Sequence, residues 1–236
     1  MISVIIPVLN EEKILSKNIE YFKNIAKHTQ LIFVDGGSRD NTIRTIRGVG
    51  CCLIAPRGRA SQMNKGSDYA EHEILLFLHV DTLLDIRAIS MLEVEMKKNP
   101  KLLGGCFTQV ICHPNPVYKW IAWTGNVRAR MFKIFFGDQG IFVRKDVFGK
   151  LLGFPKVTTC EDILFTRKLR EMGEVSILKY PIVCSARHWQ EAGILRTTMT
   201  HWKTRWDLDK RHKDEKYFMD TLPEAEHDNP FEGSVS

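Results

Sequence analysis

The chain has 236 residues, 44% of them hydrophobic and 26% charged, which is ordinary for a globular protein. This length allows one large domain with a sizeable core, so no disulfide staple is required. Six scattered cysteines include no CxxC pair, which argues against a zinc site or a redox motif, and we expect reduced thiols in a cytoplasmic protein. We also expect neither a signal peptide nor a membrane span, because the chain starts with a β-branched run and has no long apolar segment.

The net charge of +6 is unevenly distributed along the chain. Residues 220–236 carry five acidic side chains and no Lys or Arg, so the body up to Met219 has 34 basic and 23 acidic side chains, a net charge of +11. A basic body favours anionic partners, among them nucleotides, nucleic acid and an anionic membrane face. The acidic tail has no hydrophobic periodicity, and we expect it to be mobile.

The first hundred residues alternate between strand and helix patterns. Short apolar runs predict strands at residues 2–6, 31–35, 51–55 and 74–78, the first of them ended by Pro7. Polar start signals followed by apolar residues at helical spacing predict helices at about residues 10–25, 40–48 and 60–70. This alternation predicts an α/β fold with a doubly wound, mostly parallel central sheet.

The second half breaks this rhythm, and we expect an antiparallel extension of the sheet there. After a helix at about 85–98, the pattern predicts strands at residues 104–111, 137–144, 175–178 and 182–186. It predicts helices at about 120–135, 161–172 and 195–206.

The stretch Leu75–Thr82 is the most informative one in the chain. It is apolar up to Leu78 and then turns polar at His79 and Asp81, as a buried parallel strand does at its end. Open α/β sheets bind ligands at the carboxyl ends of their strands, where a carboxylate can hold a divalent cation against a diphosphate. The alternative is that Asp81 only caps the helix that begins near Asp85.

Polar residues follow all four strands of the first half, in the order Asn10 and Glu11, Asp35, Arg57 and Arg59, and Asp81. The carboxyl ends of parallel strands share one edge of the sheet, so we expect these side chains to meet. Arginines suit phosphate oxygens, and carboxylates suit the hydroxyl groups of a nucleoside or a hard cation. The pattern predicts a nucleoside-diphosphate site, although the chain has neither a GxGxxG fingerprint nor a P-loop.

Three segments resemble the opening signatures of family 2 glycosyltransferases with the GT-A fold: Val4–Glu11, Phe33–Asp40 and Leu78–Thr82. Further segments resemble one bacterial subgroup, named for its genomic association with radical-SAM/selenodomain proteins: Pro56–Ala60, Gln62–Asn64, Gly137–Gly140, Glu161–Asp162 and Ser185–Arg187. The resemblance covers about residues 2 to 206. It implies one GT-A domain over residues 1–219, with a nucleotide-binding half at about 1–100 and an acceptor half at about 101–219.

The resemblance implies an enzyme that moves a sugar from a nucleotide-diphosphate sugar, commonly a UDP-sugar, to an acceptor with inversion. It implies donor contacts at Pro7, Asn10, Glu11, Asp35, Arg57, Arg59, Gln62 and Asn64. It implies acceptor or sugar contacts at Asp138 and Gln139. Asp162, with Glu161 beside it, matches the position of the catalytic base, and each of the two is also a good helix start. Asp81 matches the last position of the family's DxD element and would bind Mg²⁺ or Mn²⁺.

His79 departs from the family pattern, because it stands where the first Asp of the DxD element would be. Imidazole prefers softer ions than Mg²⁺. We therefore expect His79 to contact ribose or phosphate, which leaves Asp81 as the one carboxylate on the metal.

The helix over 120–135 allows two interpretations. Its apolar residues share one face and its basic residues lie elsewhere, which favours a core helix with a basic outer face over a helix on a membrane interface. The apolar set is Trp120, Trp123, Val127, Met131 and Phe135, and the basic set is Lys119, Arg128, Arg130 and Lys133. The helix with Trp202 and Trp206 repeats the pattern, which raises a lipid-linked acceptor and a peripheral position at the inner face of the plasma membrane as hypotheses.

Two rival functions remain beside the glycosyltransferase. A nucleotidyltransferase shares this architecture but usually has a glycine-rich basic loop after the first strand, which the segment Pro7–Glu11 does not supply. A non-catalytic module for an anionic ligand or membrane surface is compatible with the basic body, although we expect no nucleic-acid partner. The sugar, the acceptor and the oligomeric state are left open by the sequence.

Overall fold

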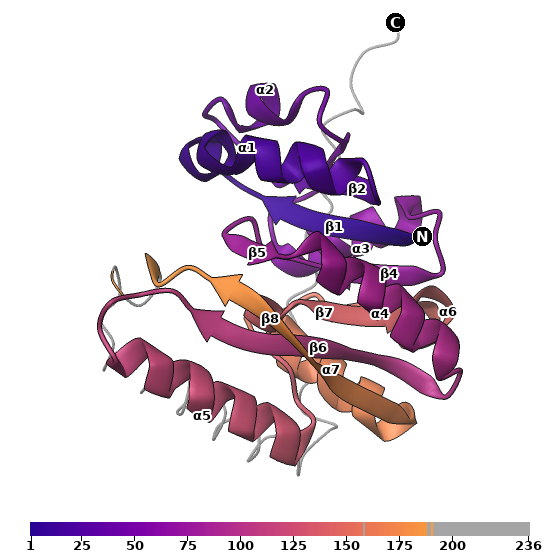
Figure 1. Cartoon of the computed structure of the whole chain (residues 1–236). Helices are drawn as coiled ribbons and strands as arrows, with labels where there is room; N and C mark the ends of the chain where they lie inside the picture. Colours follow the sequence, from indigo (N-terminus) through magenta and orange to yellow (C-terminus); the bar gives the residue numbers. More distant parts are fainter. Residues whose placement is uncertain (158, 188–189, 191–236) are drawn as a thin grey trace, which may run out of the picture. The chain divides into compact units, whose positions relative to one another are not determined.

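The computed structural model describes residues 1–157, 159–187 and 190, and in these residues eight strands form one mixed sheet (Figure 1). In chain order they are β1 Ile2–Val8, β2 Gln30–Asp35, β3 Cys51–Ile54, β4 Ile74–Phe77, β5 Thr82–Leu84, β6 Leu102–Ile111, β7 Ile141–Arg144 and β8 Glu174–Cys184. The whole sheet lies in one compact unit, Met1–Ala186. The predicted helix at 195–206, the tail 220–236 and the domain end at residue 219 lie outside the described residues and stay predictions.

The spatial order of the strands is β3-β2-β1-β4-β7-β6-β8-β5. β1 pairs in parallel with both β2 and β4, and β2 pairs in parallel with β3. β7 is antiparallel to β4 and to β6, and β5 is antiparallel to β8, whereas β6 and β8 are parallel. The predicted doubly wound parallel half and its antiparallel extension are confirmed.

Helices pack on both faces of the sheet or against one another. They are α1 Glu12–Ala26, α2 Thr42–Ile46, α3 Arg59–Tyr69, α4 Ile86–Lys98, α5 Val117–Phe132, α6 Lys145–Lys150 and α7 Glu161–Met172, with a 3-10 turn η1 at Gly137–Gln139. On one face, Phe22 of α1 packs edge-on against Phe33 of β2, with ring centroids 5.5 Å apart. On the other face, Phe77 of β4 packs against Phe148 of α6 and against Phe154 before α7. Alternation along each strand therefore supplies two apolar faces, as a buried sheet requires.

The first strand continues through Pro7 to Val8, so the prediction that Pro7 ends it is wrong. Val8 O accepts a hydrogen bond from Gly36 N on the β2 side, and by alternation Pro7 faces β4. β4 pairs only as far as Ile5, so no partner at position 7 requires the N–H that proline lacks. Proline is tolerated in this central strand because it stands past the end of its neighbour.

Two further strand predictions are corrected by pairing. The segments 175–178 and 182–186 belong to one strand, β8, which crosses an irregularity where Phe107 and Thr108 of β6 pair with Leu178 and Pro181. The three-residue strand β5 was not predicted, because so short a run has no periodicity of its own. It exists because β8 extends far enough to pair with it.

Helix α5 has its apolar face outward, contrary to the prediction of a core helix. Its buried residues are Tyr118, Ala122, Asn126 and Ala129. Trp120, Trp123 and Met131 were correctly placed on one face, but their exposed fractions are 61%, 62% and 69%. The periodicity identified the helix, but it could not tell which of its two faces meets the sheet.

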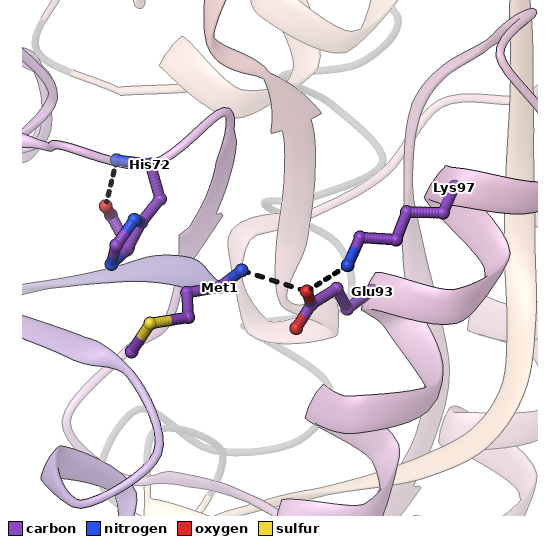
Figure 2. A network of polar contacts seen from close by, with 5 residues as sticks. Met1, His72, Glu93 and Lys97 are labelled. Carbon is purple, nitrogen blue, oxygen red and sulfur yellow. Dashed lines mark hydrogen bonds and ion pairs between the residues drawn. The ribbon is translucent and has the colours of Figure 1, made fainter.

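The amino-terminal end of β1 is tied to α4, away from the carboxyl ends of the parallel strands. Figure 2 shows Glu93 Oε1 accepting from the Met1 amino group at 2.9 Å and from Lys97 Nζ at 2.7 Å. Beside it, His72 N donates to Ser3 Oγ at 3.2 Å. These exposed ion pairs stabilise the fold by about 0.2–1 kcal/mol each at most.

Gly105 allows β6 and β8 to pair, and its replacement tests that pairing. A Cβ at position 105 would lie 1.8 Å from Ser176 O, a backbone atom of β8. Gly105→Ala is therefore expected to lower the free energy of unfolding by about 3 kcal/mol, measured by urea denaturation. Gly149→Ala in α6 is the matched control, because a Cβ there meets nothing within 4 Å and helix propensity favours Ala by about 0.5–1 kcal/mol. Equal effects of the two substitutions would contradict the described β6–β8 register.

Candidate active site at the carboxyl edge of the parallel strands

The four parallel strands β3, β2, β1 and β4 end at the same edge of the sheet, as their parallel pairing requires. The predicted polar residues after these strands therefore share this edge. The cap of α4 is Asp85, whose Oδ1 accepts from Arg87 N at 2.7 Å. Asp81 lies outside that capping interaction, so the alternative explanation for its position is removed.

Asp35 organises the turn after β2. Its side chain is buried, and its Oδ2 accepts from Gly37 N at 2.8 Å and from Ser38 N at 2.9 Å. Ser38 Oγ donates to the other carboxylate oxygen. These three bonds fix the turn, which favours a bracing role beside the predicted contact with a nucleoside.

The loops after β1 and β2 are held together by side chains from both. Asn10 has a positive φ of 54°, its N donates to Ser38 Oγ at 2.8 Å, and its Oδ1 accepts from Arg39 N at 2.8 Å. Glu11 N donates to Thr42 Oγ1 at 2.8 Å. Asn tolerates the left-handed conformation better than most residues, and here the Asn10 side chain also bonds the loop after β2. The result is a rigid rim above Pro7, which is itself buried in β1.

Gln62 and Asn64 of α3 are occupied by the backbone of neighbouring segments. The buried Gln62 Nε2 donates to Val8 O at 2.8 Å and to Val34 O at 2.7 Å, which joins the ends of β1 and β2. Asn64 donates to Phe154 O and accepts from Phe154 N, at 2.8 and 2.9 Å. This geometry favours positioning roles for both residues over the predicted direct contact with the donor.

An ion pair joins the start of α3 to the start of α7. Arg59 Nε lies 3.2 Å from Glu161 Oε1, with the Glu161 side chain buried and the Arg59 side chain half exposed. Burial raises the pKa of Glu161, and the nearby Arg59 charge opposes that rise. Arg57 is also exposed at this loop. A guanidinium that is fixed on one side and open on the other suits an anionic ligand.

Asp162 is bound to the turn that follows α5. Its Oδ2 accepts from Gly137 N at 2.7 Å, and a Cβ at Gly137 would lie 2.6 Å from His79 Nε2. The end of β4, the turn η1 and the start of α7 therefore meet at one place. Burial lowers the pKa of His79, and the positive charge of Arg59 lowers it further. The carboxylates of Asp81 and Asp162 oppose this shift. A neutral imidazole adds no positive charge to this place.

Asp138 lies in a network that the second half of the chain supplies. Gln109 Nε2 donates to Asp138 Oδ2 at 2.5 Å, and Cys184 Sγ lies 2.9 Å from Asp138 O. Asp138 Oδ1 is buried and has no hydrogen-bond partner. Burial raises the pKa of Asp138 to about 6, and the carboxylates of Asp162 and Asp81 act in the same direction.

Gln139 faces into the protein and is fully buried. Its Oε1 accepts from Phe136 N at 3.1 Å and from an Arg128 amino group at 3.4 Å. The Arg128 guanidinium lies over the Phe136 ring, 3.4 Å from its centroid. Gln139 therefore fixes the turn that carries Asp138, whereas its amide nitrogen Nε2 is buried without a partner.

Gln109, Arg128 and Cys184 were not predicted as site residues. Gln109 could have been found, because it is a polar residue inside the otherwise apolar run of β6. Arg128 was assigned to the outer basic face of its helix, and Cys184 had no local signal. All three contact the turn η1 only through tertiary packing.

The described residues contain no group of three or more His, Cys, Asp or Glu side chains that could hold a metal ion alone. Asp81 can supply one hard oxygen ligand, and the carboxylates of Asp81 and Asp162 are near enough to Asp138 to raise its pKa. Mg²⁺ and related ions often take one or two carboxylates from the protein and the rest from phosphates and water. The edge therefore fits a cation that binds together with a diphosphate.

Comparison with known proteins decides the family. The model of glycosyl transferase family 2 matches residues 3–152. The chain belongs to glycosyl transferase family 2. The family assignment made from the sequence motifs is confirmed, and it covers all four parallel strands together with η1 and β7.

Solved structures show the same GT-A fold. A mannosyltransferase from Pyrobaculum calidifontis, in complex with GDP-Man and Mn²⁺, superposes with a TM-score of 0.58 at 20% identity, covering 78% of this chain and 56% of that one. S. aureus TarS residues 1–349, in complex with UDP-GlcNAc, superpose with a TM-score of 0.62 at 17% identity, covering 78% and 58%. This chain thus spans a little over half of these two structures.

A curated relative is similar over a shorter stretch. An undecaprenyl-phosphate 4-deoxy-4-formamido-L-arabinose transferase from Shewanella sediminis (strain HAW-EB3) is 28% identical over 93 residues, which cover 34% of this chain and 28% of the relative. No helix in the part of the chain that the structure describes is long and apolar enough to cross a membrane.

The raised pKa of Asp138 predicts a specific pH dependence of stability. Its carboxyl keeps a proton to higher pH when folded than when unfolded, so the folded state loses stability as pH rises through about 4 to 6. Asp138→Asn removes this loss. From pH 4.5 to 7.5 the variant is expected to gain about 2 kcal/mol in free energy of unfolding relative to the wild type, measured by urea titration at each pH.

The control for Asp138→Asn is Asp68→Asn, which removes an exposed carboxyl from α3. A constant difference between Asp138→Asn and the wild type across this pH range would show that Asp138 is not titrating in a buried site.

Proposed function

We propose that this protein transfers a sugar from a nucleotide-diphosphate sugar, with a UDP-sugar as the expected donor, to a lipid-linked acceptor. The observation that carries the proposal is the Arg59–Glu161 ion pair. This ion pair holds the Arg59 guanidinium, which suits a diphosphate, close to Asp162, the residue expected to be the catalytic base. The family membership supports glycosyl transfer in particular.

The donor would lie across the carboxyl edge of β1, β2 and β4. The braced loops at Asn10 and Asp35 form a fixed rim for the nucleoside, and Arg57 and Arg59 are open toward the diphosphate. A site that is rigid before the ligand arrives loses less entropy on binding. His79, neutral and packed against the turn at Gly137, can donate one hydrogen bond to the ribose or a phosphate without attracting more negative charge.

Mg²⁺ or Mn²⁺ would be held by Asp81 together with the donor's phosphate oxygens. When bound, such an ion offsets the charge that develops on the departing diphosphate. The structure of the mannosyltransferase from Pyrobaculum calidifontis contains Mn²⁺ with GDP-Man, which supports a divalent ion here. Arg59 adds a second positive charge at the leaving group.

Asp162 would act as the base for an acceptor hydroxyl. Gly137 N donates to Oδ2 and Ile163 N donates to Oδ1, and these bonds fix the orientation of the carboxylate. The acceptor oxygen loses its proton to Asp162 as it attacks the anomeric carbon, and the bond from that carbon to the diphosphate oxygen breaks with its electron pair. Attack opposite to the leaving group inverts the anomeric centre.

The proposed acceptor and location are drawn from the similar transferase described above. The curated relative is named for an undecaprenyl-phosphate substrate, which supports a lipid-linked acceptor. A protein acting on such a lipid would work at the inner face of the plasma membrane, bound peripherally. Membership of the radical-SAM/selenodomain-associated subgroup belongs to the same proposal.

Donor binding is the first test of the proposed function. Asp81→Ala is expected to weaken Mn²⁺-dependent binding of UDP-sugars by about 100-fold, because a carboxylate ligand and its charge are lost. Calorimetry against UDP-, GDP- and dTDP-sugars, with and without Mn²⁺, measures these affinities and shows which nucleotide base the site prefers. Asp68→Ala on α3 is the matched control. No binding of any donor to the wild type would overturn the proposal.

Turnover tests the role of Asp162. Asp162→Asn is expected to keep donor affinity within about three-fold and to lower the transfer rate by about 10²- to 10⁴-fold, the range for loss of a general base. The measurement is transfer of radiolabel from UDP-sugar into a butanol-extractable fraction of bacterial lipids. An unchanged rate would contradict the base role.

The products also separate the rival chemistry. A glycosyltransferase releases a nucleoside diphosphate, whereas a nucleotidyltransferase acting on a nucleoside triphosphate and a sugar phosphate releases pyrophosphate. Release of pyrophosphate would assign the same edge to nucleotidyl transfer.

A further inference from the structure

Helix α5 presents large apolar side chains to solvent. Figure 1 shows α5 running below β6 and β8. Trp120, Trp123 and Met131 are more than half exposed. Together with Val127 they succeed one another at steps of three, four and four residues, so all four share one face of the helix. Val117 and Phe132 at the ends of the helix are exposed as well. A soluble helix normally turns such a face to the core.

This orientation is fixed by specific bonds on the opposite face. Asn126 Oδ1 accepts from Gln109 N and Asn126 Nδ2 donates to Gln109 O, both at 2.8 Å. The small side chains of Ala122 and Ala129 are buried beside Asn126 and allow close approach to the sheet. The helix therefore cannot rotate to bury its tryptophans without breaking two buried hydrogen bonds.

The helix itself carries only basic charges. Residues 117–133, which are α5 and its C-cap, contain four Lys or Arg side chains and no Asp or Glu. Lys119 and Arg130 are exposed, and their helical positions adjoin Trp123 on one flank of the face. Tryptophan beside basic residues on one side of a helix is typical of a helix that lies in a lipid headgroup region.

We propose that the exposed face of α5, formed by Trp120, Trp123, Val127 and Met131 with Lys119 and Arg130, docks on a membrane surface that carries anionic lipids. Charge complementarity favours this occupant. A second copy of the chain docked through the same face would bring two basic flanks together without an acidic partner. The acidic tail has complementary charge, but Phe231 is its one aromatic side chain, so it offers little to cover two tryptophans.

The helix is joined to the site by a short stretch of chain. Five residues after α5 ends at Phe132, Gly137 N donates to the expected base Asp162. A docked α5 would hold that turn close to the lipid headgroups, where a lipid-linked acceptor presents its reacting group. This inference rests on the peripheral membrane position proposed above, and it adds the surface responsible.

The experiment is flotation of the full chain with vesicles of phosphatidylcholine alone or with 30% phosphatidylglycerol. The wild type is expected to float with the anionic vesicles and to be released by salt. Trp120→Ala/Trp123→Ala is expected to lower the partition coefficient by about ten-fold or more. Lys119→Gln/Arg130→Gln is expected to lower it by about 25-fold, about five-fold for each cation.

Matched controls keep the number of changes but move them elsewhere. Lys13→Gln/Lys65→Gln removes two exposed cations from α1 and α3, and Tyr69→Ala removes an exposed aromatic ring at the end of α3. Both should float like the wild type. Far-ultraviolet circular dichroism and thermal unfolding of every variant verify that each is folded.

Several outcomes would overturn the proposal. Failure of the wild type to float would do so, as would equal flotation of the α5 variants and the wild type. Flotation only after removal of residues 220–236 would assign the face to the tail. A dimer that the α5 variants convert to a monomer without vesicles would assign the face to a second copy of the chain. Calorimetric donor binding without vesicles separates the two proposals. Absence of wild-type flotation together with intact donor binding overturns the docking surface alone, whereas absent donor binding overturns the sugar transfer and leaves the surface standing.

Discussion

The parallel pairing of β1 with both β2 and β4 is the constraint on which the rest of the structure depends. It directs three strand ends, and β3 beside them, to one edge of the sheet. The antiparallel return through β7 then brings the turn η1 to the end of β4, and α7 starts next to both. Residues more than a hundred positions apart in the chain, such as Arg59 and Glu161, meet for this reason.

The edge combines firm mechanical support with unbalanced charge. The side chains of Asp35, Gln62 and Asn64 form hydrogen bonds with neighbouring backbone atoms, and these bonds fix the loops before any ligand binds. Around Asp138, by contrast, burial raises the pKa of the carboxyl, and the nearby carboxylates of Asp162 and Asp81 add to that rise. Such a cluster gains stability from a bound cation, because a positive ion removes the mutual repulsion. The neutral His79 leaves the negative charge of these carboxylates uncompensated, whereas a protonated imidazole would compensate part of it.

Helix α5 connects the chemistry with a surface. Its inner face is specified by Asn126 and small residues, and its outer face carries the tryptophans. The same helix contributes Arg128, which lies over Phe136 and contacts Gln139 in the turn that holds Asp138. The outer face of α5 is therefore linked to the expected base Asp162 by a short stretch of chain and by the contacts of Arg128. A transferase whose acceptor is carried by a membrane needs this proximity, because the reacting group cannot travel far from the headgroups.

The sequence by itself determined the alternation of strands and helices, the parallel half, the family and the residues at the strand ends, because hydrophobic periodicity and short motifs are local properties. Tertiary structure alone decided that Pro7 continues β1, that β5 exists, and that Gln109 and Cys184 support Asp138, since each depends on a partner distant in the chain. It also decided which face of α5 is buried. The spacing of Trp120, Trp123 and Met131 defines a stripe, but two hydrogen bonds between Asn126 and Gln109 determine that the stripe faces outward.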